Sequence, residues 1–301
     1  MRTADRNAAV TRHRLAESGL GLIERLQVRG PRTAPPRDES YCAHFQICLP
    51  YRGALAWHVG GDHVVADPNQ VIFVTGGESY RMSRPVDGGY SEIIVTVDPS
   101  LIAGTLGVAE RHVPAHVLFR RRSRLADRRL QWLGASCLHD SREEQWDGMA
   151  SDAWLIEFVR SALAAPPRVA GASPSSLRAL ARAKEYLSAN LGAPVRLVHA
   201  ARAARTSPAY LTTLFRCLEG LPLHQYLVRL RLARSLAELP HAPDIARLSG
   251  DLGFSTHSRF TAAFRRTYGC TPSTYRDARR RDQASVRTRA KAIERSRQRS
   301  A

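Results

Sequence analysis

The sequence predicts a two-domain α+β protein in which a strand-rich N-terminal domain precedes an all-helical C-terminal domain. Two observations support this prediction. Between Tyr41 and Val97, short runs rich in β-branched and aromatic residues recur about every ten residues, separated by turns that contain Gly, Pro, Asp and Asn. From residue 177 onward, apolar residues recur at helical spacing, and one helical unit occurs twice.

The N-terminal half is predicted to contain strands followed by helices. Residues 1–40 lack a strand pattern and are predicted to be a mobile segment with a short helix at 15–26. The strand-rich stretch predicts a small sandwich or barrel. Helical periodicity at 124–138 and 153–163 extends this domain, which we place at 41–165. The two helices either pack against the strands or form the seam of a dimer.

The second half carries most of the positive charge. Residues 166–176 form a Pro- and Gly-containing linker ahead of the helical domain at 177–278. Residues 279–301 are a basic tail predicted to be either disordered or a frayed helix. Of the formal net charge of +18, residues 1–176 carry +2, residues 177–278 carry +9 and the tail carries +7. This asymmetry predicts a polyanionic partner for the C-terminal part. Arginine dominates the basic residues of the whole chain, which a coding bias explains more simply than selection for phosphate contacts.

The C-terminal repeat predicts a double helix-turn-helix domain. Five positions recur at an offset of 49 residues: Leu211, Phe215, Arg216, Gly220 and Tyr226 correspond to Phe260, Phe264, Arg265, Gly269 and Tyr275. Upstream the offset is 48, so the one-residue difference lies in the turn between the two helices of each copy. A repeat whose length varies only at a turn indicates two copies of one supersecondary unit. Combined with the basic charge, this unit predicts a DNA-binding domain.

The second helix of each copy has an apolar face and an outward face. The predicted anchors are Tyr210, Leu211, Leu214 and Phe215 in the first copy and Phe260, Ala263 and Phe264 in the second. The predicted base-contacting residues are Ala209, Thr212 and Thr213 in the first copy and His257, Ser258, Arg259, Thr261 and Ala262 in the second. Hydroxyls, methyls and guanidinium groups of this kind recognise base edges in the major groove. Arg216, Arg265 and Arg266 lie later in the helices and are predicted to bind phosphates.

Residues 177–277 resemble the C-terminal DNA-binding domain of AraC/XylS-type transcription regulators. The resemblance rests on YLSANL at 186–191, on Ser207-Pro208-Ala209-Tyr210-Leu211 with Leu214-Phe215-Arg216, and on Gly253-Phe254, Phe264-Arg265, Gly269, Thr271-Pro272 and Tyr275-Arg276. It implies an all-α, seven-helix domain in which a long helix joins two helix-turn-helix units that enter adjacent major-groove segments. The base-contacting residues above occupy the family's base-contacting positions. Arg205 stands where the family has a turn glycine, so this turn needs either another geometry or a left-handed arginine.

Residues 41–98 resemble, more weakly, the cupin-like β-barrel sensor domain that many such regulators carry. The similarity is greatest over residues 76–98. The metal-binding HxH pair of cupin enzymes is missing, because His58 and His63 are five residues apart, and His44 is a third histidine of the same stretch. We therefore expect no metal, no cofactor and no catalytic residues. Three aromatic residues form either the core or a ligand cage: Trp57, Tyr80 and Tyr90.

The leading interpretation is a sequence-specific transcription regulator, not an enzyme, that is modulated by a small molecule or by dimerisation through its N-terminal domain. Double-stranded promoter DNA is the predicted partner, and a small-molecule effector, RNA polymerase and a second copy of the chain are further candidates. The alternatives are a cupin-type enzyme fused to a DNA-binding module and a non-specific architectural DNA binder. Five scattered cysteines without a CxxC motif, no apolar run of about 18 residues and no secretory signal predict a reduced, cytoplasmic protein. Activator and repressor roles stay open.

Overall fold

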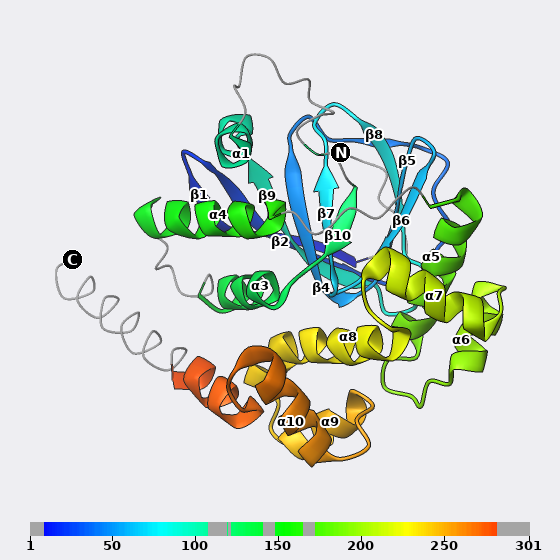
Figure 1. The fold of residues 1–301 in the computed structure, drawn as a ribbon. Helices are drawn as coiled ribbons and strands as arrows, with labels where there is room; N and C mark the ends of the chain where they lie inside the picture. Colours follow the sequence, from blue (N-terminus) through cyan, green and yellow to red (C-terminus); the bar gives the residue numbers. More distant parts are fainter. Residues whose placement is uncertain (1–8, 108–118, 120–121, 141–147, 165–171, 282–301) are drawn as a thin grey trace.

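The described residues form two antiparallel sheets with three helices in the N-terminal half and a helical C-terminal half (Figure 1). The structure is a computed structural model that describes residues 9–107, 119, 122–140, 148–164 and 172–281. The predicted linker at 166–176 and the predicted tail at 279–301 therefore lie largely outside the described residues.

The larger sheet has six strands in the order β1-β2-β9-β4-β7-β10. Their bounds are Ala9–Ser18 (β1), Gly21–Arg29 (β2), Tyr90–Val97 (β9), Gln46–Gly53 (β4), Gln70–Val74 (β7) and Ser123–Leu125 (β10). The smaller sheet has four strands in the order β3-β8-β5-β6, with bounds Ser40–Tyr41 (β3), Ser79–Ser83 (β8), Leu55–Val59 (β5) and Asp62–Ala66 (β6). In the part of the chain that the structure describes, the two sheets do not close into one barrel, so the predicted cupin-like barrel is not confirmed.

Each face of the six-stranded sheet is covered. One face packs on helices α1 (Pro99–Leu106), α3 (Arg128–Asp140) and α4 (Gly148–Leu163) through a core that includes Phe73 and Phe158. The other face packs on the small sheet. The apolar residues of α3 and α4 thus face the sheet core, which favours the packing alternative over a dimer seam.

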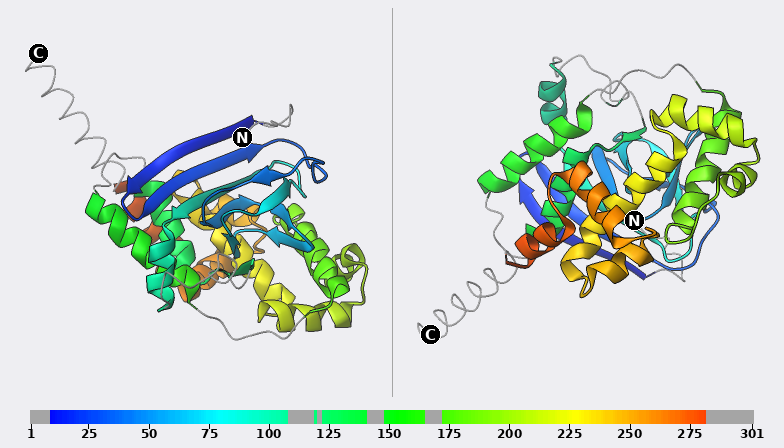
Figure 2. Two further views of the ribbon diagram at one scale, coloured as in Figure 1. Left: turned by 90° about the horizontal axis from the view of Figure 1, so that it is seen from above. Right: turned by 60° about the horizontal axis from the view of Figure 1, so that its bottom comes forward.

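The predicted mobile segment with a helix at 15–26 is wrong over residues 9–29. These residues form the β1–β2 hairpin, and β2 pairs with β9 from Gly21 opposite Val97 to Val28 opposite Tyr90. Figure 2 shows the hairpin at one edge of the six-stranded sheet. The apolar residues of a segment this short fit both a helical and an alternating pattern, and the pairing with β9 decides between them.

The C-terminal half is all helical, as predicted. Its helices are α5 (Pro174–Ala189), α6 (Leu197–Ala204), α7 (Pro208–Glu219), α8 (Leu223–Glu238), α9 (Ile245–Asp251) and α10 (His257–Tyr268), followed by helical residues 272–281. These seven α-helices match the number that the resemblance implied. Helix α8 lies between the sheets and the α9–α10 pair (Figure 1).

At the start of the predicted tail the structure has the helical alternative, because the last helix continues past residue 278. Arg279 and Arg280 belong to this helix. Arg280 donates from Nε to the Pro240 carbonyl (3.1 Å) and from Nη2 to the Ala242 carbonyl (2.7 Å). These first two residues of the predicted tail therefore support the fold.

Candidate nucleic-acid interface

The two copies of the repeat begin and end their second helices in the same way. Ser207 caps α7 by accepting a hydrogen bond from the Tyr210 amide, and Thr256 caps α10 by accepting one from the Arg259 amide. These caps are 49 residues apart in the sequence and satisfy amides that the first helical turn leaves without a partner. Gly220 and Gly269 end the helices in the left-handed conformation.

The turns between the paired helices differ, as the change of offset predicted. Arg205 ends α6 with φ 57°, and it is the only non-glycine residue with positive φ among the described residues. In the second unit Gly253 adopts φ 81° one residue after the end cap of α9. The first turn therefore uses the left-handed arginine that the missing glycine implied.

The predicted base-contacting residues lie on the solvent-facing side of α7 and α10. Ala209 and Thr213 are exposed and Thr212 is half-buried in the first unit. In the second unit four are exposed and Thr261 is half-buried; the exposed residues are His257, Ser258, Arg259 and Ala262.

The predicted anchors are buried with one exception. Leu211, Leu214, Phe215, Phe260, Ala263 and Phe264 all lie in the two C-terminal cores. Tyr210 is 46% exposed, and its hydroxyl lies 2.8 Å from Ser176 Oγ at the start of α5. Tyr210 therefore ties α7 to α5 at the surface, and its assignment as a core anchor is wrong.

The outward chemistry of the two units differs. In α7 the Thr212 hydroxyl donates to the Pro208 carbonyl (2.9 Å) and that of Thr213 donates to the Ala209 carbonyl (3.3 Å). This leaves methyl groups and acceptor lone pairs on the surface. In α10 the exposed Arg259 donates from Nη1 to Ser255 Oγ (3.0 Å). The second unit thus carries the only guanidinium among the predicted base-contacting residues.

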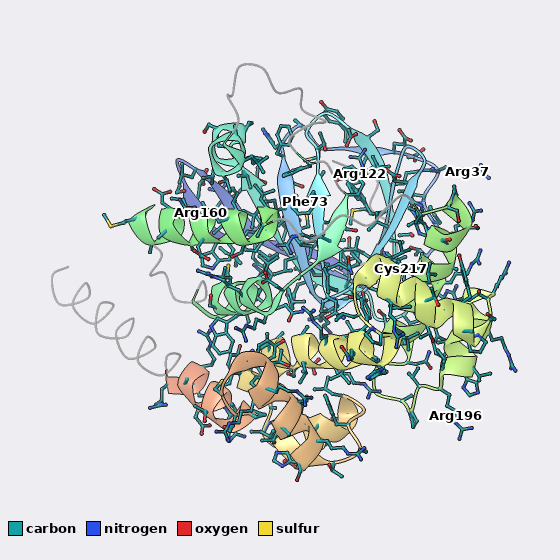
Figure 3. All side chains as sticks on the ribbon, in the orientation of Figure 1. Arg37, Phe73, Arg122, Arg160, Arg196 and Cys217 are labelled. Carbon is teal, nitrogen blue, oxygen red and sulfur yellow. The ribbon has the colours of Figure 1, made fainter. Side chains whose placement is uncertain are left out.

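Further exposed arginines lie on these helices and beside the first unit. Arg216, Arg265 and Arg266, predicted to bind phosphates, are all exposed. Sequence reasoning did not single out Arg196, which precedes α6 and projects away from the body of the protein (Figure 3). Its position just before α6, the first helix of the first unit, is the sequence feature that could have indicated a contact with DNA.

One buried arginine holds the two units together. Arg231 of α8 donates from Nε to the Leu191 carbonyl (2.9 Å), from Nη1 to the Gly253 carbonyl (2.7 Å) and from Nη2 to the Ala193 carbonyl (2.9 Å). These carbonyls belong to the loop before the first unit and to the turn of the second. Burial lowers the pKa of Arg231, yet three acceptors compensate its charge.

Two of the three histidines singled out in the N-terminal half, His58 and His63, lie side by side on β5 and β6. The rings of His58 and His63 stack with centroids 4.4 Å apart, and His58 Nε2 lies 3.4 Å from Ser83 Oγ. Burial, followed by the neighbouring His63, lowers the pKa of His58 to about 4. His44 is exposed. Across the described ranges, no group of three or more His, Cys, Asp or Glu residues is placed to hold a metal ion.

The three aromatic residues named as core or cage belong to the packing between the sheets. Trp57 and Tyr90 are buried there, and Tyr80 packs against the same cluster with its ring 6.2 Å from that of Trp57. This placement supports the core alternative.

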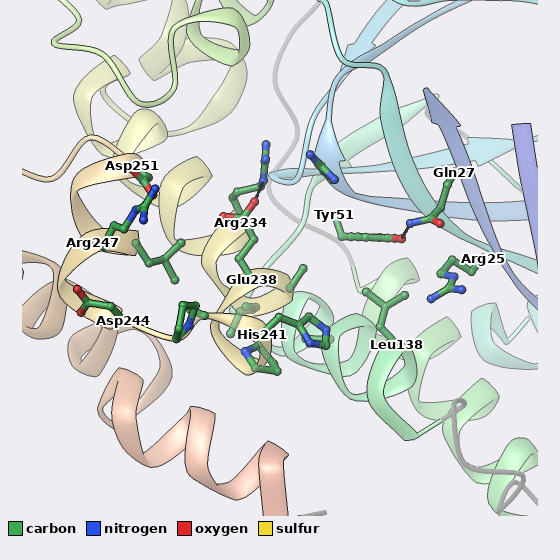
Figure 4. A pocket seen from close by; sticks show the side chains of 18 residues that line it. Arg25, Gln27, Tyr51, Leu138, Arg234, Glu238, His241, Asp244, Arg247 and Asp251 are labelled. Atoms are coloured by element: carbon green, nitrogen blue, oxygen red, sulfur yellow. Dashed lines mark hydrogen bonds and ion pairs between the residues drawn. The ribbon is translucent and has the colours of Figure 1, made fainter. Parts of the chain in front are cut away.

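A cleft of about 480 Å³ separates the N-terminal strands and α3 from the end of α8 and from α9 (Figure 4). Arg25, Arg52 and Tyr51 line it on the strand side. Arg234 and Arg247 line the other side, where they pair with Glu238 and Asp251. Among the described residues Arg25 and Arg52 have no carboxylate partner, and Arg25 Nε is buried without an acceptor. The strand side of the cleft therefore carries uncompensated positive charge.

Within the described residues, none of the helices is both long and apolar enough to cross a bilayer.

Comparison with known proteins identifies the class of the C-terminal half. The family described as "Helix-turn-helix domain" matches residues 200–278. The regulatory protein PocR of Salmonella typhimurium is 34% identical over 96 residues, which are 32% of this chain and 32% of PocR. The Msm operon regulatory protein of Streptococcus mutans is 32% identical over 95 residues, 31% of this chain and 34% of that protein. The chain thus spans about a third of the length of these relatives.

A solved structure of a transcriptional regulator from Chromobacterium violaceum, described as AraC-type, is also similar. It is 26% identical, with a TM-score of 0.33, and covers 36% of this chain and 96% of its own. Residues 200–278 are an AraC-type helix-turn-helix domain, the class that the repeat and the resemblance predicted.

Proposed function

We propose that the protein is a transcription regulator that binds double-stranded DNA in a sequence-specific manner through α7 and α10. The observation that supports this most directly is the pair of matched helices whose caps, anchors and outward polar faces repeat at an offset of 49 residues. Ala209, Thr212 and Thr213 would contact bases in one major-groove segment. His257, Ser258, Arg259, Thr261 and Ala262 would contact bases in the next.

The test is selection of bound fragments from a random DNA pool, followed by dissociation constants for the selected site and for random DNA at several salt concentrations. A site-specific regulator should bind the selected site about 10³-fold or more tightly than random DNA. Equal affinity for both would favour the architectural DNA binder and refute the proposal. The cupin-type enzyme alternative would instead require turnover of a substrate.

We also propose that the cleft between the strands and α8–α9 binds a small anionic effector. Arg25 and Arg52 would supply the charge, and Tyr51 would supply a hydroxyl. Guanidinium groups are well suited to carboxylates and phosphates because they donate two parallel hydrogen bonds. Residues of the N-terminal half and of α9 both line this cleft, so a bound anion would change the contact between these two parts.

A screen of organic carboxylates and sugar phosphates by thermal shift tests this proposal. Stabilisation that Arg52→Ala abolishes, and that Arg37→Ala at another exposed position retains, would support the cleft. An equal response of both variants would place the ligand elsewhere. The cupin-like character of the N-terminal half, self-association and contact with RNA polymerase stay predictions.

A further inference from the structure

Two glutamines of the N-terminal half bind the last residues of the two recognition helices. Gln70, at the start of β7, donates from Nε2 to Glu219 Oε2 of α7 (2.8 Å). Gln131 of α3 accepts at Oε1 a hydrogen bond from the Tyr268 hydroxyl of α10 (3.0 Å). Glu219 and Tyr268 are 49 residues apart and end their helices, so they occupy the same position in the two copies. The N-terminal half therefore holds both units at equivalent points.

The two glutamines belong to one structural element. Gln131 Nε2 donates to the carbonyl of Pro68, which lies two residues before Gln70 in the turn between β6 and β7 (3.1 Å). Gln70 is 1% exposed and Gln131 is 6% exposed. Because both side chains are buried, neither can exchange its protein partners for water without a substantial cost. The two contact points are thus connected through the β6–β7 turn.

The same turn also binds helix α8, which joins the two units. Asp67 Oδ2 accepts a hydrogen bond from the Tyr226 hydroxyl (2.9 Å), and Asn69 Nδ2 donates to the Tyr226 carbonyl (2.9 Å). Asp67, Asn69 and Tyr226 are all fully buried. Such a satisfied buried network specifies one arrangement because each alternative leaves polar groups without partners. The turn therefore has a defined position relative to α8.

Each recognition helix is held from a second side. Lys184 Nζ of α5 lies 2.6 Å from Glu219 Oε1, and both side chains are almost completely buried. The Tyr268 ring packs near Trp132, the neighbour of Gln131, with ring centroids 6.2 Å apart. The helix ends that Gln70 and Gln131 contact are therefore also fixed by a second neighbour, Lys184 at α7 and Trp132 at α10.

We propose that Gln70 and Gln131 are positioning residues for DNA recognition, which set the separation and relative rotation of α7 and α10 and so the spacing of the two DNA segments that the chain prefers. This inference rests on the proposed DNA-binding function. A recognition helix contacts base edges with its N-terminal residues, whereas the glutamines hold the C-terminal ends. Their loss should relax the spacing requirement and leave the base preference within each segment unchanged.

The test compares DNA sites that differ only in spacing. Starting from the selected site, one or two base pairs are inserted or removed between the two recognised segments. Each base pair shifts one segment by about 3.4 Å along the axis and rotates it by roughly a tenth of a turn. We expect the wild-type protein to lose about tenfold or more in affinity for each step away from the preferred spacing.

The variants remove the contacts without touching the DNA-facing side chains. Gln70→Leu removes the bond to Glu219, and Tyr268→Phe removes the bond to Gln131 while keeping the ring against Trp132. The double variant should bind the preferred spacing within about threefold of the wild type, and its spacing penalty should fall from about tenfold to about twofold for each step. Gln225→Leu, an exposed glutamine on α8, is the matched control and should keep the wild-type spacing profile.

Two outcomes would overturn the inference. One is a double variant with the spacing profile of the wild type, and the other is a variant that binds the preferred site at least fivefold more tightly, which would make the contacts inhibitory. If Gln70→Leu does not fold, Tyr268→Phe alone decides, because it removes a single hydroxyl. Failure of the proposed function is separate, because the wild-type protein would then bind selected and random DNA equally.

Discussion

Replacing Arg231 by methionine should lower the free energy of local unfolding of the C-terminal domain more than replacing any surface arginine. Arg231 is 8% exposed and makes three hydrogen bonds to carbonyl groups, at 2.7 to 2.9 Å. Its guanidinium carbon also lies 5.9 Å from the centre of the Phe254 ring. Methionine preserves much of the apolar stem but cannot donate to any of the three carbonyls.

The expected size of the effect follows from these contacts. A hydrogen bond from a charged donor contributes about 1.5–3 kcal/mol, and part of this is offset because the substitution also removes the cost of burying the cation. Leu191 and Gly253 are only half-buried and Ala193 is exposed, so water can replace part of the loss. We expect Arg231→Met to lower the free energy of opening by about 3–4 kcal/mol.

Native-state hydrogen exchange of amides in α8 and α9 measures this free energy locally, which suits a chain of two domains better than a single unfolding midpoint. Arg247→Met is the control, because Arg247 is exposed and lies 3.9 Å from Asp251. An exposed pair of this kind contributes at most about 1 kcal/mol. A loss below about 1 kcal/mol for Arg231→Met, equal to that of the control, would refute the assignment of Arg231 as the link between the two units.

Three further predictions concern DNA binding and pH. Arg259→Ala should reduce the preference for one base pair by about 1–3 kcal/mol. Arg265→Ala should instead lower the affinity for every DNA sequence alike and reduce its salt dependence. Competition binding to single-base variants of the selected site distinguishes the two results. Deleting residues 282–301 should lower affinity uniformly across DNA sequences, and a change in the selected site would contradict this. Burial raises the pKa of Glu92 from 4.5 to about 8, so the folded protein holds this proton where the unfolded chain releases it, and stability should fall by up to about 5 kcal/mol as pH rises from about 4.5 to 8. Glu92→Gln should remove this fall in urea unfolding at pH 5, 7 and 9, and an unchanged fall would show that another group is responsible.

The helices of the C-terminal domain were largely predictable because their signals are local. Each recognition helix carries its own signals: a hydroxyl cap at Ser207 or Thr256, a closing glycine at Gly220 or Gly269, and apolar residues at helical spacing between them. The exposure of Arg259 followed from the same periodicity. The left-handed turn at Arg205 was one of two alternatives that the sequence left open, and the structure selects it.

Predictions failed where the deciding contact is distant in the chain. Residues 9–29 form strands because β2 pairs with β9, more than 60 residues further on. Tyr210 has the spacing of a core residue, but it is 46% exposed and its hydroxyl contacts Ser176 of α5. In both cases the local pattern fits two structures, and a tertiary partner selects one.

The sequence alone therefore determined the repeat, the class of the C-terminal domain and the residues that face outward, because each depends on neighbours within one helix or turn. Only the tertiary structure revealed how the two units are held relative to each other. Gln70 and Glu219 are 149 residues apart, and Gln131 and Tyr268 are 137 residues apart. No periodicity within a segment specifies such a pair, since it forms only after the two halves of the chain have packed together.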